Sequence, residues 1–343
     1  MTGTRKIVEV LNGKTIFPPP VWLMRQAGRY LPEYRQTRAK AGSFLDLCYS
    51  PDHAVEVTLQ PIRRYAFDAA ILFSDILVIP DALKREVRFD EGSGPRLKPL
   101  QIDEIRPLAS MPVMDHLSPV IEVVRRLRGE LPQETALLGF CGAPWTVATY
   151  MIAGQGSREQ AEARTLAYAD PGKMHAILDL VAQVTVDYLS GQIAAGVDAV
   201  QLFDSWAGSL SPDQFERFVI ARTAWIVAEL KKRHPDVPVI GFPKGAGGKL
   251  GAYARETGID AIGLDETVDP FWANRELPDG LPVQGNLDPL ALLAGGEPMR
   301  TAVARILDAL GHRPHIFNLG HGIGKETPIA HVEELVELVR AGR

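Results

Sequence analysis

Eight short apolar runs recur along the chain, and each ends abruptly in polar, glycine or proline residues. Most of the runs are apolar throughout, which is typical of strands buried on both faces of a parallel sheet. The eight runs are PVWLM (20–24), AAILF (69–73), ALLGF (136–140), DAVQLF (198–203), VPVIGF (237–242), DAIGL (260–264), LPVQ (281–284) and HIFNL (315–319).

The segments between these runs are long enough for helices and show helical patterns. We expect helices over 187–195, 215–231, 291–310 and 330–341. A strand followed by a helix eight times predicts either a closed barrel or a doubly wound sheet. The count of eight, and the lack of a glycine-rich dinucleotide fingerprint after the first run, favour the barrel. We therefore expect an α/β fold in which the whole chain, 1–343, forms one domain, a single (β/α)8 TIM-type barrel.

One connection is longer than the others. The segment 76–135 includes EVRFDEGSGPRLKPL (86–100), in which Gly92-Ser93-Gly94-Pro95 predicts a hairpin turn. We therefore expect a hairpin-containing insertion after the second strand, beside the active-site face, where it could cover the site or form a subunit contact.

The composition narrows the classes of function. With 343 residues, of which 46% are hydrophobic and 23% charged, the chain is expected to be a soluble globular protein. Its formal net charge of −5 argues against nucleic-acid binding, which needs a basic surface. An anionic substrate would therefore have to meet a local cluster of cations.

Cysteine usage and hydropathy indicate the compartment. Cys48 and Cys141, the two cysteines, stand far apart and match no metal or redox spacing, so we expect no disulfide framework and a reducing environment. No apolar run approaches the roughly 18 residues of a membrane span, and the N-terminal segment lacks the apolar region of a signal peptide. We expect a cytoplasmic protein without a membrane partner.

Active sites of such barrels lie at the carboxyl ends of the strands, so polar residues there are the candidates. Arg25 and Arg29 follow the first run. If 26–30 formed a helical turn, the i,i+4 spacing would place both guanidinium groups on one face, where they could bind carboxylate or phosphate in bidentate fashion. The alternative is a pair of surface arginines neutralised by Glu33 and neighbouring acids.

Two further candidates follow the second and third runs. Asp75 comes directly after an apolar run, where a carboxylate can be an acid, a base, a metal ligand or the counter-ion of a developing cation. A helix cap or an ion pair is the structural alternative. Tyr150 stands about two turns into a helix that Pro144 can begin, and there it is either a ligand or part of the core.

Ser205 and His321 follow the fourth and eighth runs. The Ser205 hydroxyl can donate to a substrate carboxylate or bond to local backbone, and no G-x-S-x-G pattern surrounds it. His321 stands between glycines in NLGHGIG, which allow close approach of an anionic group. Lys244, near the end of the fifth run, could instead form a Schiff base as in an aldolase, or contact an anion.

Taken together, these segments resemble the uroporphyrinogen decarboxylase family. RQAGRYLPEYR after the first run and GFCGAPWTVATYMIAG after the third are similar to its two signature segments. FSDIL, FDSWAG, IGFPKGAG, VQGNLDP and NLGHGI follow in the family's order, so the resemblance covers the chain from about 20 to 334. It implies a (β/α)8 domain, usually as a homodimer, that uses no metal or other cofactor.

The resemblance also implies a substrate and residue roles. The substrate is a small molecule, uroporphyrinogen III or I, whose four acetates become methyls to give coproporphyrinogen and carbon dioxide in porphyrin and heme biosynthesis. Asp75 would bind the pyrrole N–H groups, and with Arg29, Tyr150 and His321 it is implicated in catalysis. The residues implied to contact the substrate are Arg25, Gln26, Ala27, Gly28, Arg29, Asp75, Tyr150, Ser205 and His321.

Three alternatives stay open. Methyltransferases of the same barrel superfamily build a zinc site from histidine and cysteine on the late strands, which Cys48 and Cys141 cannot supply. An aldolase acting through Lys244, and a porphyrin carrier without turnover, are compatible with the same residue types.

Overall fold

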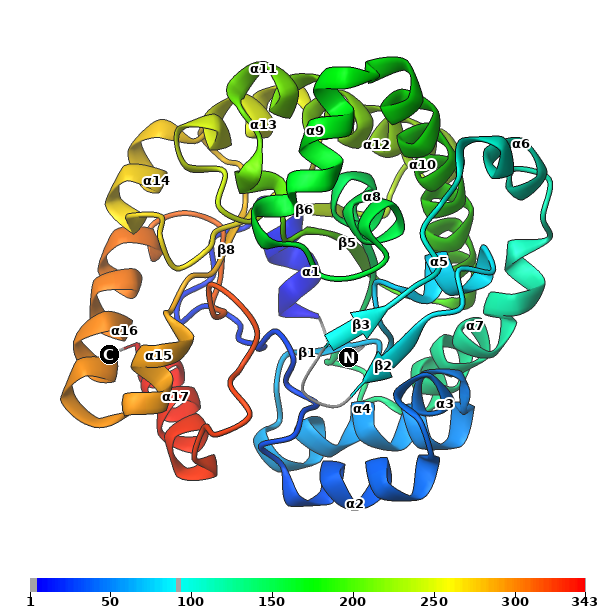
Figure 1. Cartoon of the computed structure of the whole chain (residues 1–343). Helices are drawn as coiled ribbons and strands as arrows, with labels where there is room; N and C mark the ends of the chain where they lie inside the picture. Colours follow the sequence, from blue (N-terminus) through cyan, green and yellow to red (C-terminus); the bar gives the residue numbers. More distant parts are fainter. Residues whose placement is uncertain (1–4, 91–93, 343) are drawn as a thin grey trace.

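The computed structural model describes residues 5–90 and 94–342, and it places seven parallel strands in one curled sheet with helices around it (Figure 1). In the order in which they pair, the strands are β1 (Ala69–Ile71), β4 (Ala136–Gly142), β5 (Ala199–Asp204), β6 (Val239–Pro243), β7 (Ala261–Gly263), β8 (Val283–Gln284) and β9 (His315–Ile316). Because every pairing is parallel, the carboxyl ends of all seven strands meet at one end of the sheet. The predicted α/β class is confirmed.

The first predicted strand, 20–24, is not a strand in the structure. It forms one isolated parallel bridge, between Val21 and Phe317. The Phe317 N–H donates to the Pro20 carbonyl at 2.9 Å, and the Asp68 N–H donates to the Val21 carbonyl at 3.0 Å. The segment therefore lies between β9 and β1, the two edge strands of the sheet. Pro20 and the two prolines before it lack N–H donors, which limits the ladder to these few bonds.

A row of buried polar side chains crosses the interior of the curled sheet. Trp22 is fully buried, and its indole N–H donates to Gln284 Oε1 at 2.9 Å. The Gln284 amide then donates to Gln201 Oε1 at 3.1 Å. Since β5 and β8 are not neighbours in the sheet, this bond spans the interior. It ties the segment 20–24 to both strands, and it pairs polar groups that would be costly to bury alone.

The helices surround the sheet and connect its strands. The α-helices are α1 (Lys6–Leu11), α2 (Pro32–Ala41), α3 (Phe44–Tyr49), α4 (Pro51–Tyr65), α5 (Val78–Ala82), α6 (Ile105–Leu108), α7 (Val113–Glu130), α8 (Pro144–Ala153), α9 (Ala161–Ala169), α10 (Pro171–Ala195), α11 (Pro212–Phe215), α12 (Ala221–Arg233), α13 (Leu250–Glu256), α14 (Pro270–Glu276), α15 (Pro289–Ala294), α16 (Gly296–Leu310) and α17 (Ile329–Ala341). The other helical turns are η1 (Ile102–Glu104), η2 (Arg158–Gln160), η3 (Ala207–Ser209), the π-helical η4 (Glu216–Ile220) and η5 (Gly247–Lys249). Across residues 5–90 and 94–342, no helix is both long and apolar enough to cross a membrane.

The predicted helices exist, with different limits. The helix expected over 187–195 is the last part of α10, and the one expected over 330–341 is α17. The single helix expected over 291–310 is divided into α15 and α16 at Gly295, whose φ of 67° is outside the right-handed helical region.

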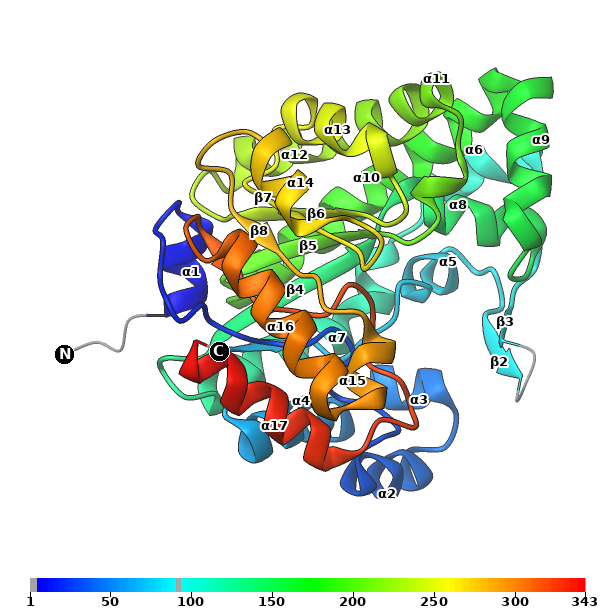
Figure 2. The same cartoon turned by 90° about the vertical axis from the view of Figure 1, so that its left-hand side faces the viewer.

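Different elements lie at the two ends of the strands (Figure 2). At the amino ends of the strands, α1 packs against β4 and β9 and buries its apolar face. At the other end, an antiparallel hairpin of β2 (Arg88–Asp90) and β3 (Gly94–Arg96) projects from the body (Figure 2). Part of its predicted turn, 91–93, lies outside the described residues.

The base of the hairpin packs beside the carboxyl ends of the strands. Leu77, Val87 and Leu97 form a small buried cluster, against which Tyr150 packs. The Leu97 N–H donates to the Gly154 carbonyl at 2.7 Å, at the end of α8. The hairpin is therefore anchored next to one of the candidate site residues.

Candidate active site

Asp75 stands at the carboxyl end of β1, just before α5. Its Oδ1 accepts the Leu77 N–H at 2.8 Å, so one oxygen caps the turn that follows the strand. Burial of the carboxyl group raises the pKa of Asp75 to about 6, and the Leu77 N–H and the positive charge of Arg25 oppose the rise. By its accessible surface Asp75 is half-buried, and a desolvated carboxylate with few compensating partners is the kind of group that favours a cationic ligand.

Arg25 is the residue around which the other candidates gather. Its charge lowers the pKa of Asp75, Tyr150 and His321, so all three lie within electrostatic reach of its guanidinium group. The Arg25 side chain lies across Gly322, where a Cβ atom would come within 2.3 Å of Arg25 Cδ. Any larger residue at 322 would therefore collide with the Arg25 side chain in this conformation.

The predicted helical turn over 26–30 is wrong. Arg25 adopts a left-handed backbone conformation, with φ of 60°, and the segment is a series of turns. Arg29 is exposed, its charge acts on Tyr34, and its carbonyl accepts the Arg35 guanidinium at 2.7 Å. The two arginines are thus not paired by helical spacing: Arg25 reaches the centre of the site, and Arg29 lies towards α2.

The side chain of Gln26 serves the fold. Gln26 is 1% exposed. Its Oε1 accepts the Leu23 N–H at 3.2 Å, and its Nε2 donates to the Ala69 carbonyl at 3.1 Å, so it fastens the loop to β1. The Gln26 side chain is thus occupied within the fold, and a substrate contact at this position stays a prediction. Ala27 and Gly28 are half-buried, and within residues 5–90 and 94–342 neither N–H has a hydrogen-bond partner.

His321 is a neutral imidazole in this environment. Burial lowers the pKa of His321 to about 4, the charges of Arg25 and Lys244 lower it further, and Asp265 opposes them. Near pH 7 it can exchange hydrogen bonds with a carboxylate or carboxylic acid but adds no positive charge.

Tyr150 lies in the second turn of α8, as predicted, and is half-buried. Burial raises the pKa of its phenol, a hydrogen bond with the Trp206 side chain opposes the rise, and the charges of Asp75 and Arg25 act on it in opposite directions. The Tyr150 and Trp206 ring centroids are 6.5 Å apart. Tyr150 is therefore a member of the Asp75–Arg25 site, although its ring also packs against the hairpin cluster.

Ser205 follows β5 and is half-buried between Asp204 and Trp206. In the part of the chain that the structure describes, its hydroxyl has no hydrogen-bond partner, so it is available for a ligand. Its neighbour in sequence, Trp206, packs against Tyr150, and the predicted contact of Ser205 with a substrate stays a prediction.

The sequence reasoning gave no role to three acidic residues at the carboxyl ends. Asp265 is 3% exposed and accepts the Gly245 N–H at 2.7 Å. Glu266 pairs with Lys244 at 3.1 Å, which engages the amine that a Schiff base would need. Asp204 is 2% exposed and bonds to α8. Asp204 and Asp265 directly follow predicted runs, the same position that singled out Asp75, so the signal was available.

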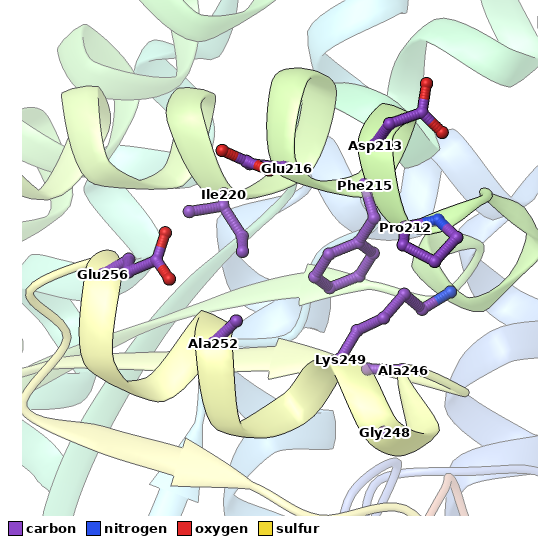
Figure 3. A pocket seen from close by; sticks show the side chains of 10 residues that line it. All are labelled: Pro212, Asp213, Phe215, Glu216, Ile220, Ala246, Gly248, Lys249, Ala252 and Glu256. Carbon is purple, nitrogen blue, oxygen red and sulfur yellow. The ribbon is translucent and has the colours of Figure 1, made fainter.

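A surface groove lies elsewhere, between the 212–220 segment and the 246–256 segment (Figure 3). It has a volume of about 710 Å³ and includes none of the candidate residues. Lys249, which points across it in Figure 3, donates to the Gly208 and Leu210 carbonyls and lies 4.9 Å from the centre of the Phe215 ring. Its cation is thus already satisfied, and the groove is not the site described above.

No group of three or more histidine, cysteine, aspartate or glutamate side chains within residues 5–90 and 94–342 is arranged to hold a metal ion. Cys48 on α3 and Cys141 on β4 are both buried, unpaired thiols. Burial raises the pKa of Cys141 to about 12, so it does not behave as an activated nucleophile.

Comparisons with known proteins cover the chain almost completely. The family model described as uroporphyrinogen decarboxylase (URO-D) matches residues 2–342. A protein of Rhizorhabdus wittichii named uroporphyrinogen decarboxylase is 65% identical over 338 residues, 98% of each chain. Proteins with the same name from Sphingopyxis alaskensis and Chelativorans sp. are 63% and 59% identical, with 98% and 99% of each chain covered.

Solved structures share the fold at much lower identity. A methyltransferase from Methanosarcina mazei superposes with a TM-score of 0.81 over 98% of both chains, at 18% identity. A B12-independent methionine synthase from Shewanella gives a TM-score of 0.52 at 12% identity, with 85% of this chain and 86% of that one covered. At these identities the likeness concerns the arrangement of strands and helices alone.

Proposed function

Because the chain belongs to the uroporphyrinogen decarboxylase family, we propose that it removes the four acetate carboxylates of uroporphyrinogen as carbon dioxide and yields coproporphyrinogen, a step of heme biosynthesis. The observation that supports this most directly is the convergence of Asp75, Arg25, Tyr150 and His321 at the carboxyl ends of the strands. A buried carboxylate beside one arginine and neutral donors suits a substrate that has anionic side chains around a ring that becomes cationic.

The reaction needs a place for the electron pair of the breaking bond. Protonation of the pyrrole ring carbon next to the one that bears the acetate gives an iminium-like cation that is conjugated to the acetate-bearing carbon. The C–CO₂ bond then breaks, its electrons neutralise the cation and leave an exocyclic methylene, and carbon dioxide departs. A second proton on the methylene carbon and loss of the first from the ring restore the pyrrole and leave a methyl group. Each acetate side chain thus becomes a methyl group, with release of one carbon dioxide and net uptake of one proton.

Asp75 is proposed to accept the pyrrole N–H groups and to stabilise the cation. A fixed charge in a site partly emptied of water acts much more strongly than in bulk solvent. The pKa of about 6 leaves the carboxyl group largely ionised near pH 7, while its burial leaves it short of compensating charge. The cation that forms during the reaction supplies that charge, so the interaction is stronger in the transition state than in the ground state.

Arg25 is proposed to bind one of the carboxylates at the periphery of the substrate. Its guanidinium group can bind a carboxylate in bidentate fashion beside the neutral His321 and the Tyr150 hydroxyl. The unpartnered N–H groups of Ala27 and Gly28, and the Ser205 hydroxyl, add uncharged donors. Arg29, exposed on the α2 side, would contact a carboxylate nearer the entrance.

The surrounding architecture supports a single site in a single domain. We propose that the segment 20–24 occupies the eighth strand position of a (β/α)8 barrel, since it forms hydrogen bonds with Phe317, just after β9, and with Asp68, just before β1. The β2–β3 hairpin is proposed to cover one side of the site, because its base packs with Tyr150. By analogy with the family, we also propose that the protein works as a homodimer in the cytoplasm.

The proposal is tested with purified protein and chemically reduced uroporphyrinogen III under anaerobic conditions. We expect release of four molecules of carbon dioxide for each coproporphyrinogen formed, without added cofactor. Binding of the porphyrinogen with no carbon dioxide release would instead indicate a carrier. The same assay with uroporphyrinogen I measures the preference of the enzyme between isomers I and III.

A further inference from the structure

Asp204, the last residue of β5, is a buried carboxyl group that the proposed reaction does not use. Asp204 is 2% exposed, and burial raises the pKa of its carboxyl group to about 7. A buried carboxyl group is costly unless hydrogen bonds compensate it. Its compensating partner lies on another element, the helix α8.

Thr146, in the first turn of α8, holds the Asp204 side chain. The Thr146 hydroxyl donates to Asp204 Oδ1 at 2.5 Å, and interactions with Thr146 oppose the rise in the pKa of Asp204. The residue at the N-cap position of α8 is Ala143, which offers no side-chain acceptor. Asp204 therefore fastens the first turn of α8 to the end of β5.

The same threonine holds the segment that follows β5. The Trp206 N–H donates to Thr146 Oγ1 at 3.0 Å, and the Trp145 indole donates to the Trp206 carbonyl at 3.1 Å. Ser205 stands between Asp204 and Trp206, and both of its neighbours are bonded to Thr146. The position of Ser205 is thus fixed by its two flanking residues.

Tyr150 is connected to the same group. It follows Thr146 by four residues on α8, so both side chains lie on one side of the helix. The Tyr150 and Trp206 ring centroids are 6.5 Å apart, and the Trp206 side chain lowers the pKa of the Tyr150 phenol. Asp204, Thr146 and Trp206 therefore connect the two hydroxyl groups, of Tyr150 and Ser205, that were proposed to contact the substrate.

We propose that Asp204 and Thr146 form a positioning pair for the decarboxylation, which fixes α8 against the 204–206 segment and sets Tyr150 relative to Ser205. The inference rests on the proposed function, and neither residue of the pair is placed in contact with the substrate. A misplacement of about 1 Å far from the reacting atoms can lower a rate by about 10²-fold. The pair therefore matters to turnover as well as to stability.

The test compares Thr146→Val, which removes the hydroxyl and keeps the branched shape, with Thr146→Ser, which keeps the hydroxyl. Thr149→Val is the matched control: Thr149 is 3% exposed on the same helix, and its hydroxyl donates to the Thr146 carbonyl at 2.7 Å. For each variant, kcat and KM are measured from carbon dioxide release, and the midpoint of thermal unfolding is recorded.

We expect Thr146→Val to lower kcat by about 10- to 100-fold, and Thr146→Ser to restore most of it. Thr149→Val should keep near-normal kcat even if its unfolding midpoint falls as far as that of Thr146→Val. Equal kcat in the two valine variants, or no rescue by serine, would overturn the positioning role. Absence of carbon dioxide release from the unaltered chain would refute the proposed function itself, which is a different result.

A second pair of variants keeps the proposal testable if Thr146→Val does not fold. Asp204→Asn retains an oxygen that can accept the Thr146 hydroxyl, whereas Asp204→Leu removes the acceptor. We expect Asp204→Asn to keep kcat within about tenfold of the unaltered chain and Asp204→Leu to lose distinctly more. Equal kcat in the two variants would contradict the role of the Asp204–Thr146 bond.

Discussion

Aspartates at the two ends of the sheet are held in opposite ways. Asp198, just before β5 at the amino ends, pairs with Arg5 and with Arg128 and accepts the N–H of Leu137 at 2.7 Å. Asp75 lies at the carboxyl end of β1, and within the described residues its carboxyl group accepts the Leu77 N–H alone; burial raises its pKa to about 6. The negative charge of Asp198 is thus balanced by cations of the protein itself, whereas that of Asp75 can be balanced by a cationic ligand.

This contrast divides the molecule into an end that stabilises the fold and an end that performs chemistry. Barrel enzymes generally place catalytic groups at the carboxyl ends of the strands and stabilising contacts at the amino ends. If the contrast is correct, neutralising Asp75 must lower activity without loss of stability, and neutralising Asp198 must lower stability without loss of activity.

The largest effect is expected for Asp75→Asn. This change keeps the shape of the side chain and removes the charge that stabilises the pyrrole cation, so kcat/KM should fall by about 10²–10³-fold, by analogy with the loss of an oxyanion-hole donor. The rate of carbon dioxide release measures it, and circular dichroism checks the fold. Asp198→Asn is the matched control at the other end, and a comparable loss of kcat/KM there would abolish the contrast.

The next largest effect is expected for Arg25→Ala. Arg25 lies within electrostatic reach of Asp75, Tyr150 and His321, so its loss should raise KM and lower kcat together, by about 10–100-fold in kcat/KM. Arg29→Ala should raise KM with a smaller change in kcat, because the charge of Arg29 acts on Tyr34, whereas that of Arg25 acts on Asp75, Tyr150 and His321. Steady-state kinetics on both variants distinguish the roles, and a larger kcat loss for Arg29→Ala would reverse the assignment.

A moderate effect is expected from pH. Asp75 has to be ionised, and its pKa in the folded protein is about 6. The value of kcat/KM should therefore rise with pH up to about 6 and level off above it, since this parameter reports groups of the free enzyme. The profile of Asp75→Asn should lack this acidic limb. An unchanged limb in the variant would assign it to another group.

A smaller effect, of opposite sign at the two ends, is expected for stability. Asp198→Asn removes the charge that pairs with Arg5 and Arg128, so the free energy of unfolding should fall by about 1–3 kcal/mol. Chemical denaturation at pH 8 measures it. The kcat of this variant should remain within about twofold of the unaltered chain, since Asp198 lies away from the site.

The smallest effect is expected for the stability of Asp75→Asn. Burial raises the pKa of Asp75 from 3.8 to about 6, so between these values the native state binds more protons than the unfolded state. The contribution of Asp75 to stability therefore falls as pH rises through this window. At pH 8 the asparagine variant should be as stable as the unaltered chain or slightly more stable. A clear loss of stability would mean that the Asp75 charge is compensated by the fold.

The sequence predicted the elements whose cause is local. Runs such as 198–203 and 237–242 became β5 and β6 because continuous apolar residues suit a sheet covered on both faces. The long motifs identified the family, and the match over residues 2–342 confirms it. Pro144 begins α8, and this start places Tyr150 in the second turn, as expected.

The remainder depends on contacts between distant segments. The i,i+4 reasoning for Arg25 and Arg29 failed because the path of the loop is set by Gln26, which bonds to Ala69, and by the fit of Arg25 on Gly322. The neutrality of His321 follows from burial next to two cations, which no local pattern encodes. Spacing identified candidates here, but only the tertiary arrangement gave them their chemical character.

The central claim is that the Asp75 charge acts on the transition state and not merely on substrate binding. A single-turnover measurement with enzyme in excess over reduced uroporphyrinogen, at saturation, compares the rate of the first carbon dioxide release in Asp75→Asn and in the unaltered chain. We predict a rate at least about 10²-fold lower in the variant while the porphyrinogen is still bound. A normal rate at saturation, with only weaker binding, would contradict the account.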